Sequence, residues 1–233
     1  MRRASGHPLI DAWTGPVIAS DECGYGAWAG PLVVCAASAP IGWDDSRIRD
    51  SKLYDSETGA RERERLYEEF YPDKARFPTA VVVVGHDVID RVGVYEALLL
   101  SHATALKAVV DKLGGEPLCV VDGNLPVHKF DVGARVIALP KGDQLVPECS
   151  LASVIGKAIR DRAMVDLDAL CPGYGFADHK GYGGDDTHAH SVALQKLGPC
   201  PYHRTSFAPI AKIIADREQG AQPRNAWELL DDD

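Results

Sequence analysis

The chain has 233 residues, of which 45% are hydrophobic and 25% are charged, and its 25 basic and 34 acidic residues give a formal net charge of −9. This composition is typical of a globular protein, and the length suffices for a continuous buried core. The apolar runs are too short to span a membrane, and the N-terminus lacks the hydrophobic segment of a secretory signal, so we expect a cytoplasmic protein. The acidic balance argues against a protein that holds nucleic acid by bulk charge alone.

Six cysteines are scattered along the chain without a Cys-x-x-Cys pair. In a chain of this length without a secretory signal, such cysteines are expected to be reduced and mostly buried. Cysteines and histidines do gather between Cys171 and His203, where a zinc site is the alternative interpretation. Their spacings match no standard set of zinc ligands, and the sequence therefore disfavours structural zinc.

The first part of the chain alternates predicted strands with predicted helices. Short runs of β-branched and other apolar residues indicate buried strands, and apolar residues at helical spacing indicate helices. A glycine-rich stretch joins the first two strands, which should form a hairpin-like pair, and Ser56 is placed to cap the first helix. In chain order the predicted elements are strands at 16–20 and 32–38, a surface helix at 56–71, a strand at 80–85, a helix at 94–113, and strands at 118–121 and 134–139.

Helices dominate from residue 147 onward. The predicted elements there are a long helix at 151–170, a polar glycine-rich loop at 172–184, and shorter helices at 189–197 and 209–218. The last residues, 219–233, carry Pro223 and end in three aspartates, which indicates a loosely attached tail. Strands that alternate with long helices predict an α/β fold with a mainly parallel or mixed sheet.

Acidic residues follow three of the predicted strands at the point where each strand ends. Asp21 and Glu22 directly follow the first strand, and Asp122 and Asp143 come after the fourth and fifth. Because the carboxyl ends of strands frame the ligand crevice of an open α/β sheet, these side chains can converge. Clustered carboxylates repel one another unless cations lie among them, and all-oxygen ligands favour Mg²⁺ or Mn²⁺. Acids after strands also serve as turn formers or helix caps, and for Asp122 alone that interpretation is equally good.

Glycines beside the first pair of acids favour a functional interpretation. Gly24, Gly26 and Gly30 follow these acids within a few residues. Glycine lets the backbone approach a ligand closely, so the amides of this stretch can hydrogen-bond a phosphate. The residues therefore indicate a phosphate-containing ligand next to a cation site.

Several motifs in this chain resemble those of one known family, and they occur in the family's order. Residues 21–31, which read DECGYGAWAGP, resemble the opening motif of ribonuclease HII, the type 2 ribonucleases H, which typically reads DEAGRGPLAGP. One such motif alone is weak evidence for the family, whereas the whole set in the family's order is highly specific. The further matches are Asp50-Ser51-Lys52, Val121-Asp122-Gly123, Lys141-Gly142-Asp143, SLASVIGKAIRD at 150–161, YGFADHKGY at 174–182, and His203-Arg204-Thr205-Ser206-Phe207 with Pro209, so that the resemblance spans residues 17 to about 212.

The resemblance implies a ribonuclease H-like fold, with a central mixed five-stranded sheet flanked by helices and a C-terminal helical part. It implies a catalytic domain over residues 1–212, followed by an acidic helix end and tail over residues 213–233. Members of this family cleave the RNA strand of RNA/DNA hybrids and nick duplex DNA 5′ of an embedded ribonucleotide, leaving 3′-hydroxyl and 5′-phosphate ends. The expected cofactors are two Mg²⁺ or Mn²⁺ ions, which clamp the attacking and leaving oxygens, and the expected protein is a monomer in ribonucleotide excision repair.

By position, the family's metal-binding and catalytic acids fall on Asp21, Glu22, Asp122 and Asp143, the residues that the strand ends also indicate. The glycine loop is suited to read the 2′-hydroxyl of RNA, and Tyr182 matches the family tyrosine that stacks on the sugar of the following deoxynucleotide. Taken alone, the cations among the matched positions would be solvated surface charges. The resemblance assigns substrate binding to Gly24, Tyr25, Gly26, Ser51, Lys52, Lys180, Tyr182 and Arg204.

One departure from the family motif lies between the two loop glycines, where the family usually has a basic residue and this chain has Tyr25. A guanidinium there can contact a phosphate beside the scissile bond, whereas a phenol donates one neutral hydrogen bond. We therefore expect weaker and more salt-sensitive binding, or a looser preference for a single ribonucleotide over RNA tracts. Two alternatives stay open, a DNA structure-selective nuclease on the same fold and a catalytically silent hybrid-binding protein.

Overall fold

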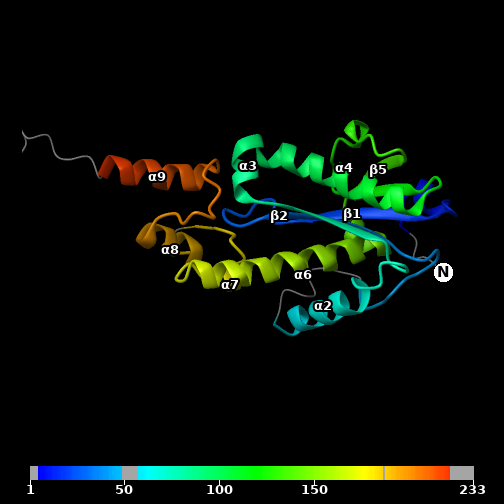
Figure 1. Ribbon diagram of the computed structural model, residues 1–233, viewed down its shortest axis with the longest axis horizontal. Coiled ribbons are helices and arrows are strands. Elements are labelled where there is room, and N and C mark those ends of the chain that lie inside the picture. The colour runs from blue at the N-terminus through cyan, green and yellow to red at the C-terminus, as the bar shows by residue number, and fades with distance from the viewer. Residues whose placement is uncertain (1–4, 49–56, 186, 221–233) are drawn as a thin grey trace, which may run out of the picture.

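A mixed sheet runs through the middle of the molecule, with helices on both of its faces (Figure 1). The computed structural model describes residues 5–48, 57–185 and 187–220. Within these ranges the strands are β1 (Val17–Cys23), β2 (Leu32–Ser38), β3 (Thr79–Val84), β4 (Leu118–Asp122) and β5 (Arg135–Leu139). They form a five-stranded sheet in the order β3-β2-β1-β4-β5. The β1–β2 and β2–β3 pairs are antiparallel, whereas the β1–β4 and β4–β5 pairs are parallel.

The helices divide into two covering layers and a group at one end of the sheet. They are α1 (Pro8–Asp11), α2 (Glu57–Phe70), α3 (His86–Val92), α4 (Val94–Leu113), the 3₁₀ turn η2 (Val127–Lys129), α5 (Gly142–Leu145), α6 (Pro147–Leu170), α7 (Phe176–His179), α8 (Ala189–Leu197) and α9 (Ala208–Gly220). Figure 1 shows α3 and α4 on one face of the sheet, and α6 with α2 on the other. The helices α8 and α9 extend beyond one end of the sheet.

Local sequence explains how the two long helices begin. Gly93, with a φ of 86°, separates α3 from α4 in a backbone conformation that favours glycine. α6 begins with Pro147, at a position where the missing N–H of proline has no partner to lose. No helix in the described ranges combines the length and the apolar character needed to cross a membrane.

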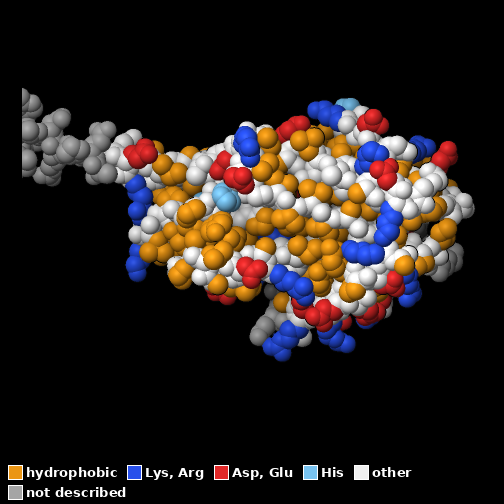
Figure 2. Space-filling model, viewed as in Figure 1, with side chains coloured by type: hydrophobic (Ala, Val, Ile, Leu, Met, Phe, Trp, Pro, Cys, Tyr) orange, Lys and Arg blue, Asp and Glu red, His pale blue; other side chains and the backbone are white. Residues whose placement is uncertain are grey.

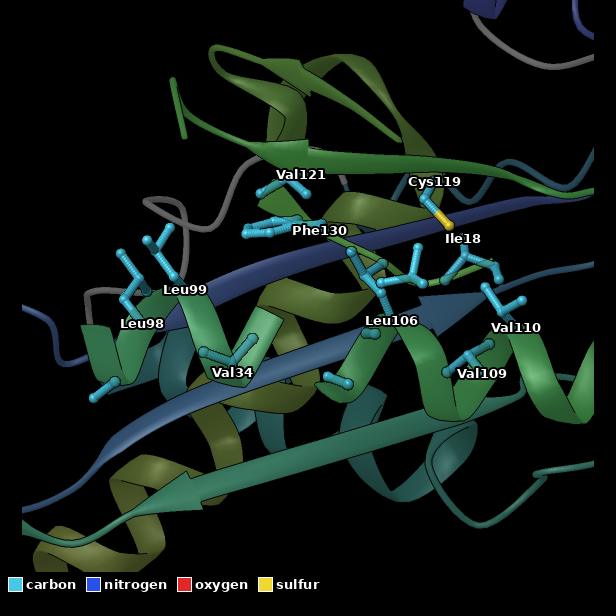
Figure 3. Packing of buried hydrophobic residues seen from close by; sticks show 14 of the residues in the cluster. Ile18, Val34, Leu98, Leu99, Leu106, Val109, Val110, Cys119, Val121 and Phe130 are labelled. Atoms are coloured by element: carbon cyan, nitrogen blue, oxygen red, sulfur yellow. The ribbon is translucent and has the colours of Figure 1, made fainter. Parts of the chain in front are cut away.

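The side chains of β1 alternate between the two faces of the sheet. Ile18 packs with Val34 and Leu106 in the core between the sheet and α4, part of which Figure 3 shows. Val17 packs on the opposite face with Cys149 of α6. Burial of each such aliphatic side chain contributes about 1.5–3 kcal/mol relative to exposure. The two cores therefore fix which face each later residue of β1 presents.

The C-terminal helices have a core of their own, and it reaches the segment between β1 and β2. Phe176, Leu194 and Ile210 pack there against Met164 of α6 and Ala29. Ala29 also pairs with His203 in an isolated antiparallel bridge. The glycine-rich loop that follows the first acids is thereby attached to the C-terminal part of the molecule.

The predicted fold class and most predicted elements are confirmed. The hairpin-like pair is the antiparallel pair β1–β2, and the helices predicted at 94–113 and 189–197 have those bounds. β1 continues to Cys23 because Glu22 and Cys23 still pair with β2, so the first two acids lie within the strand, not after it.

Four short α-helices were not predicted. α1, α5 and α7 have four residues each, too few for a helical period to show, and α3 is a seven-residue helix. α7 lies inside the segment predicted as a loop. The predicted boundary at residue 212 falls within α9, and Ser56 and the tail after residue 220 lie outside the described residues.

Candidate active site

Four carboxylates line one cavity at the carboxyl ends of the central parallel strands. Asp21 and Glu22 lie near the end of β1, Asp122 is the last residue of β4, and Asp143 is in the only turn of α5. Ser20 is paired with Val121 in the parallel β1–β4 register, which places Asp21 beside Asp122. The cavity has a volume of about 290 Å³ and is lined by Asp21, Glu22, Cys23, Gly24, Tyr25, Gly26, Asp122, Asp143, Ser153, Lys157 and Tyr182.

The two acids of β1 point toward opposite faces of the sheet, as strand alternation requires. Asp21 accepts a hydrogen bond from Ser153 of α6. Glu22 lies toward α4, where its Oε2 is 3.5 Å from Nε2 of His102. Each acid is thus approached by a polar side chain from the helix that covers its own face.

Asp122 is oriented by backbone amides. Its Oδ1 accepts a hydrogen bond from the N–H of Gly123 at 2.8 Å and from the N–H of Gly142 at 2.7 Å. Lys141, before Gly142, has a φ of 60°, and this left-handed residue turns the chain into α5. The same turn therefore fixes Asp122 and brings Asp143 to the cavity.

The cavity opposes the ionisation of two of its acids, Asp21 and Asp122. Burial, followed by repulsion from Glu22 and Asp122, raises the pKa of Asp21 well above its usual value. Burial also raises the pKa of Asp122, with a further contribution from Asp143, although the two glycine amides act in the opposite direction. Ionised carboxylates collected in this way need a balancing positive charge.

The donor set of the cavity fits a hard divalent cation. Among the described residues, no three or more His, Cys, Asp or Glu side chains are drawn together tightly enough to form a complete metal site. The four carboxylates nevertheless line one small space, and their mutual repulsion contributes to the raised pKa of Asp21 and of Asp122. Oxygen donors of this kind are the ligands that Mg²⁺ and Mn²⁺ prefer.

Two buried guanidinium groups hold the glycine loop at the cavity rim. Gly24 has a φ of 90°, and a Cβ at this position would lie 2.0 Å from Nε of Arg160. Arg160 donates hydrogen bonds to the carbonyls of Pro31 at 3.0 Å and Lys180 at 2.8 Å. Arg160 therefore joins the glycine loop to the loop that carries Tyr182.

Arg204 has a different place from the one expected. Instead of facing a phosphate, it is fully buried and donates hydrogen bonds to the carbonyls of Tyr25 at 2.9 Å and Gly30 at 3.0 Å. Burial and the nearby Arg160 lower the pKa of Arg204 to about 9. The Arg204 guanidinium therefore holds the backbone of the loop, a role that the sequence alone does not indicate.

The other residues predicted to bind substrate do not all lie at the acid cavity. Tyr182 lines the acid cavity, accepts a hydrogen bond from the N–H of Gly24, and has the Arg160 guanidinium 5.3 Å from its ring centre. Lys180 lines a neighbouring cavity of about 820 Å³ instead, and its ammonium donates to the carbonyl of Ala177. Ser51 and Lys52 lie outside the described residues.

Sequence reasoning missed several residues that contact the site. Ser153 and Lys157 line the acid cavity, Arg160 lies against Gly24 of the glycine loop, and His102 approaches Glu22 from the opposite face of the sheet. Ser153, Lys157 and Arg160 recur at intervals of four and three residues, so they share one face of α6. That spacing, within the motif SLASVIGKAIRD, was the available signal for these three residues.

Cys23 also lines the cavity, but its environment disfavours a nucleophilic role. Burial raises the pKa of the Cys23 thiol, and the neighbouring Arg160 and Lys157 only partly oppose this effect. A reactive cysteine needs the thiolate form at neutral pH. The site is therefore built around carboxylates.

A mixed sheet with acids at the ends of its central strands, and helices on both faces, defines a ribonuclease H-like nuclease. A family model described as Ribonuclease HII matches residues 18–210. Ribonuclease HII of Thermus thermophilus is 41% identical over 192 residues, which are 82% of this chain and 86% of that protein. The chain belongs to the ribonuclease HII family and is a ribonuclease H enzyme.

Solved structures show the same fold. Ribonuclease H2 from Pyrococcus horikoshii OT3 matches with a TM-score of 0.67 and 23% identity, over 88% of this chain and 100% of that chain. Bst-RNase HIII, solved in complex with Mn²⁺, matches with a TM-score of 0.61 and 21% identity, over 92% of this chain and 73% of that chain. At these identities the likeness establishes the architecture alone.

Proposed function

We propose that this chain hydrolyses the RNA strand of RNA/DNA hybrids and nicks duplex DNA 5′ of embedded ribonucleotides, leaving 3′-hydroxyl and 5′-phosphate ends. It acts as a monomer with two divalent ions. The observation that carries the proposal is that the four carboxylates, the glycine loop and Tyr182 all line one cavity. Family membership supports the reaction class, and the Mn²⁺ complex of Bst-RNase HIII supports the choice of cofactor.

Asp21, Glu22, Asp122 and Asp143 would hold the ions. When bound, Mg²⁺ or Mn²⁺ lowers the pKa of the attacking water and balances negative charge on the departing oxygen. The protein contributes orientation, because the amides of Gly123 and Gly142 fix Asp122, and Ser153 fixes Asp21.

The glycine loop would recognise the ribonucleotide. Arg160 and Arg204 hold the carbonyls of this loop from the protein interior, so the backbone amide of Gly26 would approach the substrate in a fixed direction. A 2′-hydroxyl distinguishes RNA from DNA at such a position. Tyr182, beside Gly24, offers a ring for the sugar of the next nucleotide.

The neighbouring cavity of about 820 Å³ gives the strand a path away from the acids. Lys157 and Tyr182 line both cavities, so the two spaces adjoin. The larger one lies between α2, α6 and α7, and its walls carry both basic and acidic side chains. Figure 2 likewise shows charges of both signs around a hydrophobic band on one face of the molecule. The nucleic acid would therefore be held by individually placed groups.

Cleavage of a duplex with one ribonucleotide, assayed with Mg²⁺, Mn²⁺ or EDTA, tests the proposal. We expect metal-dependent cutting on the 5′ side of the ribonucleotide, abolished in Asp122→Asn. Cutting of an all-DNA duplex would indicate a structure-selective DNA nuclease instead. Tight binding of the hybrid without cutting would indicate a silent hybrid-binding protein.

A further inference from the structure

A buried histidine lies directly beneath one acid of the cavity and has no part in the proposed reaction. His102 comes from α4, and its side chain is 0% exposed. Its Nδ1 is 2.9 Å from Oγ of Ser20, and its Nε2 is 3.5 Å from Oε2 of Glu22. Within the described residues, this Nε2 makes no hydrogen bond of normal length and geometry.

The alternation of β1 explains why one imidazole meets both residues. Ser20 and Glu22 are two positions apart, so they share the face of the strand that α4 covers, roughly 6.6 Å apart along the strand. The His102 ring lies between them and is stacked on Phe130 at 6.4 Å with an interplanar angle of 13°. The ring is thus held in one plane, with one nitrogen toward each neighbour.

The two contacts determine which nitrogen carries the proton. A carboxylate oxygen only accepts hydrogen bonds, so the nitrogen facing Glu22 must be Nε2–H. In a neutral imidazole Nδ1 is then an acceptor, and the Ser20 hydroxyl donates to it. Ser20 therefore supports the tautomer that can donate to Glu22.

We propose that Ser20 and His102 are positioning residues that orient the Glu22 carboxylate for divalent-cation binding. The inference rests on the proposed function, in which Glu22 is a metal ligand. Hydrogen bonds from groups behind the ligands fix metal-binding side chains and strengthen affinity. The Glu22 side chain is 30% exposed, and a small rotation would shorten its 3.5 Å contact with His102 to hydrogen-bond length.

The test titrates Mn²⁺ into the full-length protein without nucleic acid and follows binding by calorimetry. His102→Leu fills the same space without a donor, and His102→Gln restores a side-chain N–H. We expect His102→Leu to weaken Mn²⁺ binding about tenfold, and His102→Gln to recover most of the affinity. Both variants should unfold at temperatures close to that of the wild type. A purely structural role for His102 would change the unfolding temperature and leave Mn²⁺ affinity unchanged.

Two serine variants complete the design. Ser20→Ala removes one buried oxygen and should weaken Mn²⁺ binding about threefold, the scale of one neutral hydrogen bond. Ser20→Ala still tests the contact of His102 with Glu22 if His102→Leu does not fold. Ser101→Ala is the matched control, because Ser101 is also buried beside His102 but donates to the carbonyl of Ala97.

The outcomes separate this inference from the proposed function. Wild-type Mn²⁺ affinity in both His102→Leu and Ser20→Ala overturns the inference and leaves the enzyme intact. A wild-type chain that neither binds Mn²⁺ nor cleaves the one-ribonucleotide duplex overturns both. Equal losses in Ser20→Ala and Ser101→Ala also overturn the inference, because they would reflect general disturbance of the core.

Discussion

Two residues of the acid cavity, Asp21 and Asp122, lie where their negative charges oppose folding. Asp21 is half-buried, and burial together with Glu22 and Asp122 raises its pKa well above the usual value. A raised pKa in the folded chain means that protonation of Asp21 stabilises the fold. That stabilisation is complete below the unfolded pKa of about 3.9 and is lost as the pH rises through the folded pKa.

Asp21→Asn should therefore be more stable than the wild type at pH 7 in EDTA, by about 1 kcal/mol, and inactive in cleavage. The gain should shrink toward pH 4, where Asp21 in the folded wild type is already protonated. Thermal unfolding of both proteins at the two pH values checks this prediction. A variant less stable than the wild type at pH 7 would contradict the proposed charge repulsion.

Gly24 is the loop position least tolerant of a side chain. Its φ of 90° strains any other residue, and a Cβ would lie 2.0 Å from Nε of Arg160. Gly24→Ala should reduce the free energy of unfolding by about 1–3 kcal/mol. It should also slow cleavage about 100-fold, because the alanine side chain would displace Arg160, which holds the loop that carries Tyr182. Chemical denaturation and single-turnover cleavage measure the two effects.

Gly26→Ala is the control for Gly24→Ala. A Cβ on Gly26 would meet nothing within 4 Å, and its backbone is not in the left-handed region. We expect its stability to stay within about 0.5 kcal/mol of the wild type. Similar destabilisation of both variants would show that the loop does not depend on Arg160.

The acids of the site could be predicted from sequence, but their supports could not. Asp122 ends a predicted strand, and the carboxyl ends of parallel strands meet at one edge of the sheet, so its position beside Asp21 follows from the predicted fold. Arg204 looks like a surface cation in sequence, since nothing local shows that the carbonyls of Tyr25 and Gly30 will need donors. Such long-range hydrogen bonds depend on how the C-terminal part docks.

At the scale of elements, a chain of buried histidines connects the C-terminal helices to the loop carrying Tyr182. The Nδ1 of His203 lies 2.9 Å from the amide nitrogen of Cys200 and 3.2 Å from its carbonyl oxygen. In the neutral ring whose Nδ1 accepts from the amide, the proton is on Nε2. This Nε2–H donates to Nε2 of His190 at 2.9 Å, and Nδ1–H of His190 donates to the carbonyl of Tyr182 at 3.1 Å. In this chain of hydrogen bonds, Nδ1 of His203 and Nε2 of His190 act as acceptors and carry no proton, so both rings are neutral.

Acid should therefore destabilise the fold through these two rings. Burial lowers the pKa of His190 to about 3 and that of His203 to about 4. An unfolded histidine binds a proton below about pH 6.5, so stability falls with decreasing pH between about 6.5 and 4, by about 1.4 kcal/mol per unit for each ring. Denaturant unfolding across this range measures the slope.

Two glutamine variants assign that slope to the buried pair. His190→Gln removes one titrating ring and should make the pH dependence shallower by about 1.4 kcal/mol per unit. His128→Gln changes an exposed histidine of η2 and should leave the slope as it is. A wild-type slope in His190→Gln would mean that other groups control the acid response.

The longer helices were predicted well, whereas helices of four to seven residues were not. The twenty residues of α4 show a clear apolar spacing, whereas the four residues of α7 cannot show one. α7 forms where Gly175 and Lys180 both adopt left-handed backbone conformations. Lys180 has a φ of 54°, and its carbonyl is held by Arg160 from another element, so its conformation depends on tertiary contacts.

At the scale of the whole molecule, the formal charge of −9 is compatible with a nucleic-acid enzyme because of where the charges lie. Four of the acidic side chains line the candidate active-site cavity. On the face shown in Figure 2, basic and acidic side chains are intermixed. Binding of a polyanion should then depend on few phosphate contacts, and each contact should be measurable by its effect on salt dependence.

Among the cations that the structure describes, Lys157 lines both the acid cavity and the adjoining larger one, which places it well for such a contact. The logarithm of the binding constant should fall with the logarithm of salt concentration at a slope of about −0.9 per phosphate contact, and Lys157→Gln should reduce the slope by about one. Fluorescence anisotropy of a labelled hybrid, in an Asp122→Asn background with EDTA, measures it. Lys107→Gln is the control, because Lys107 is exposed on α4 and paired with Asp111 at 2.8 Å. An unchanged slope in Lys157→Gln, or the same change in Lys107→Gln, would show that the strand does not follow this path.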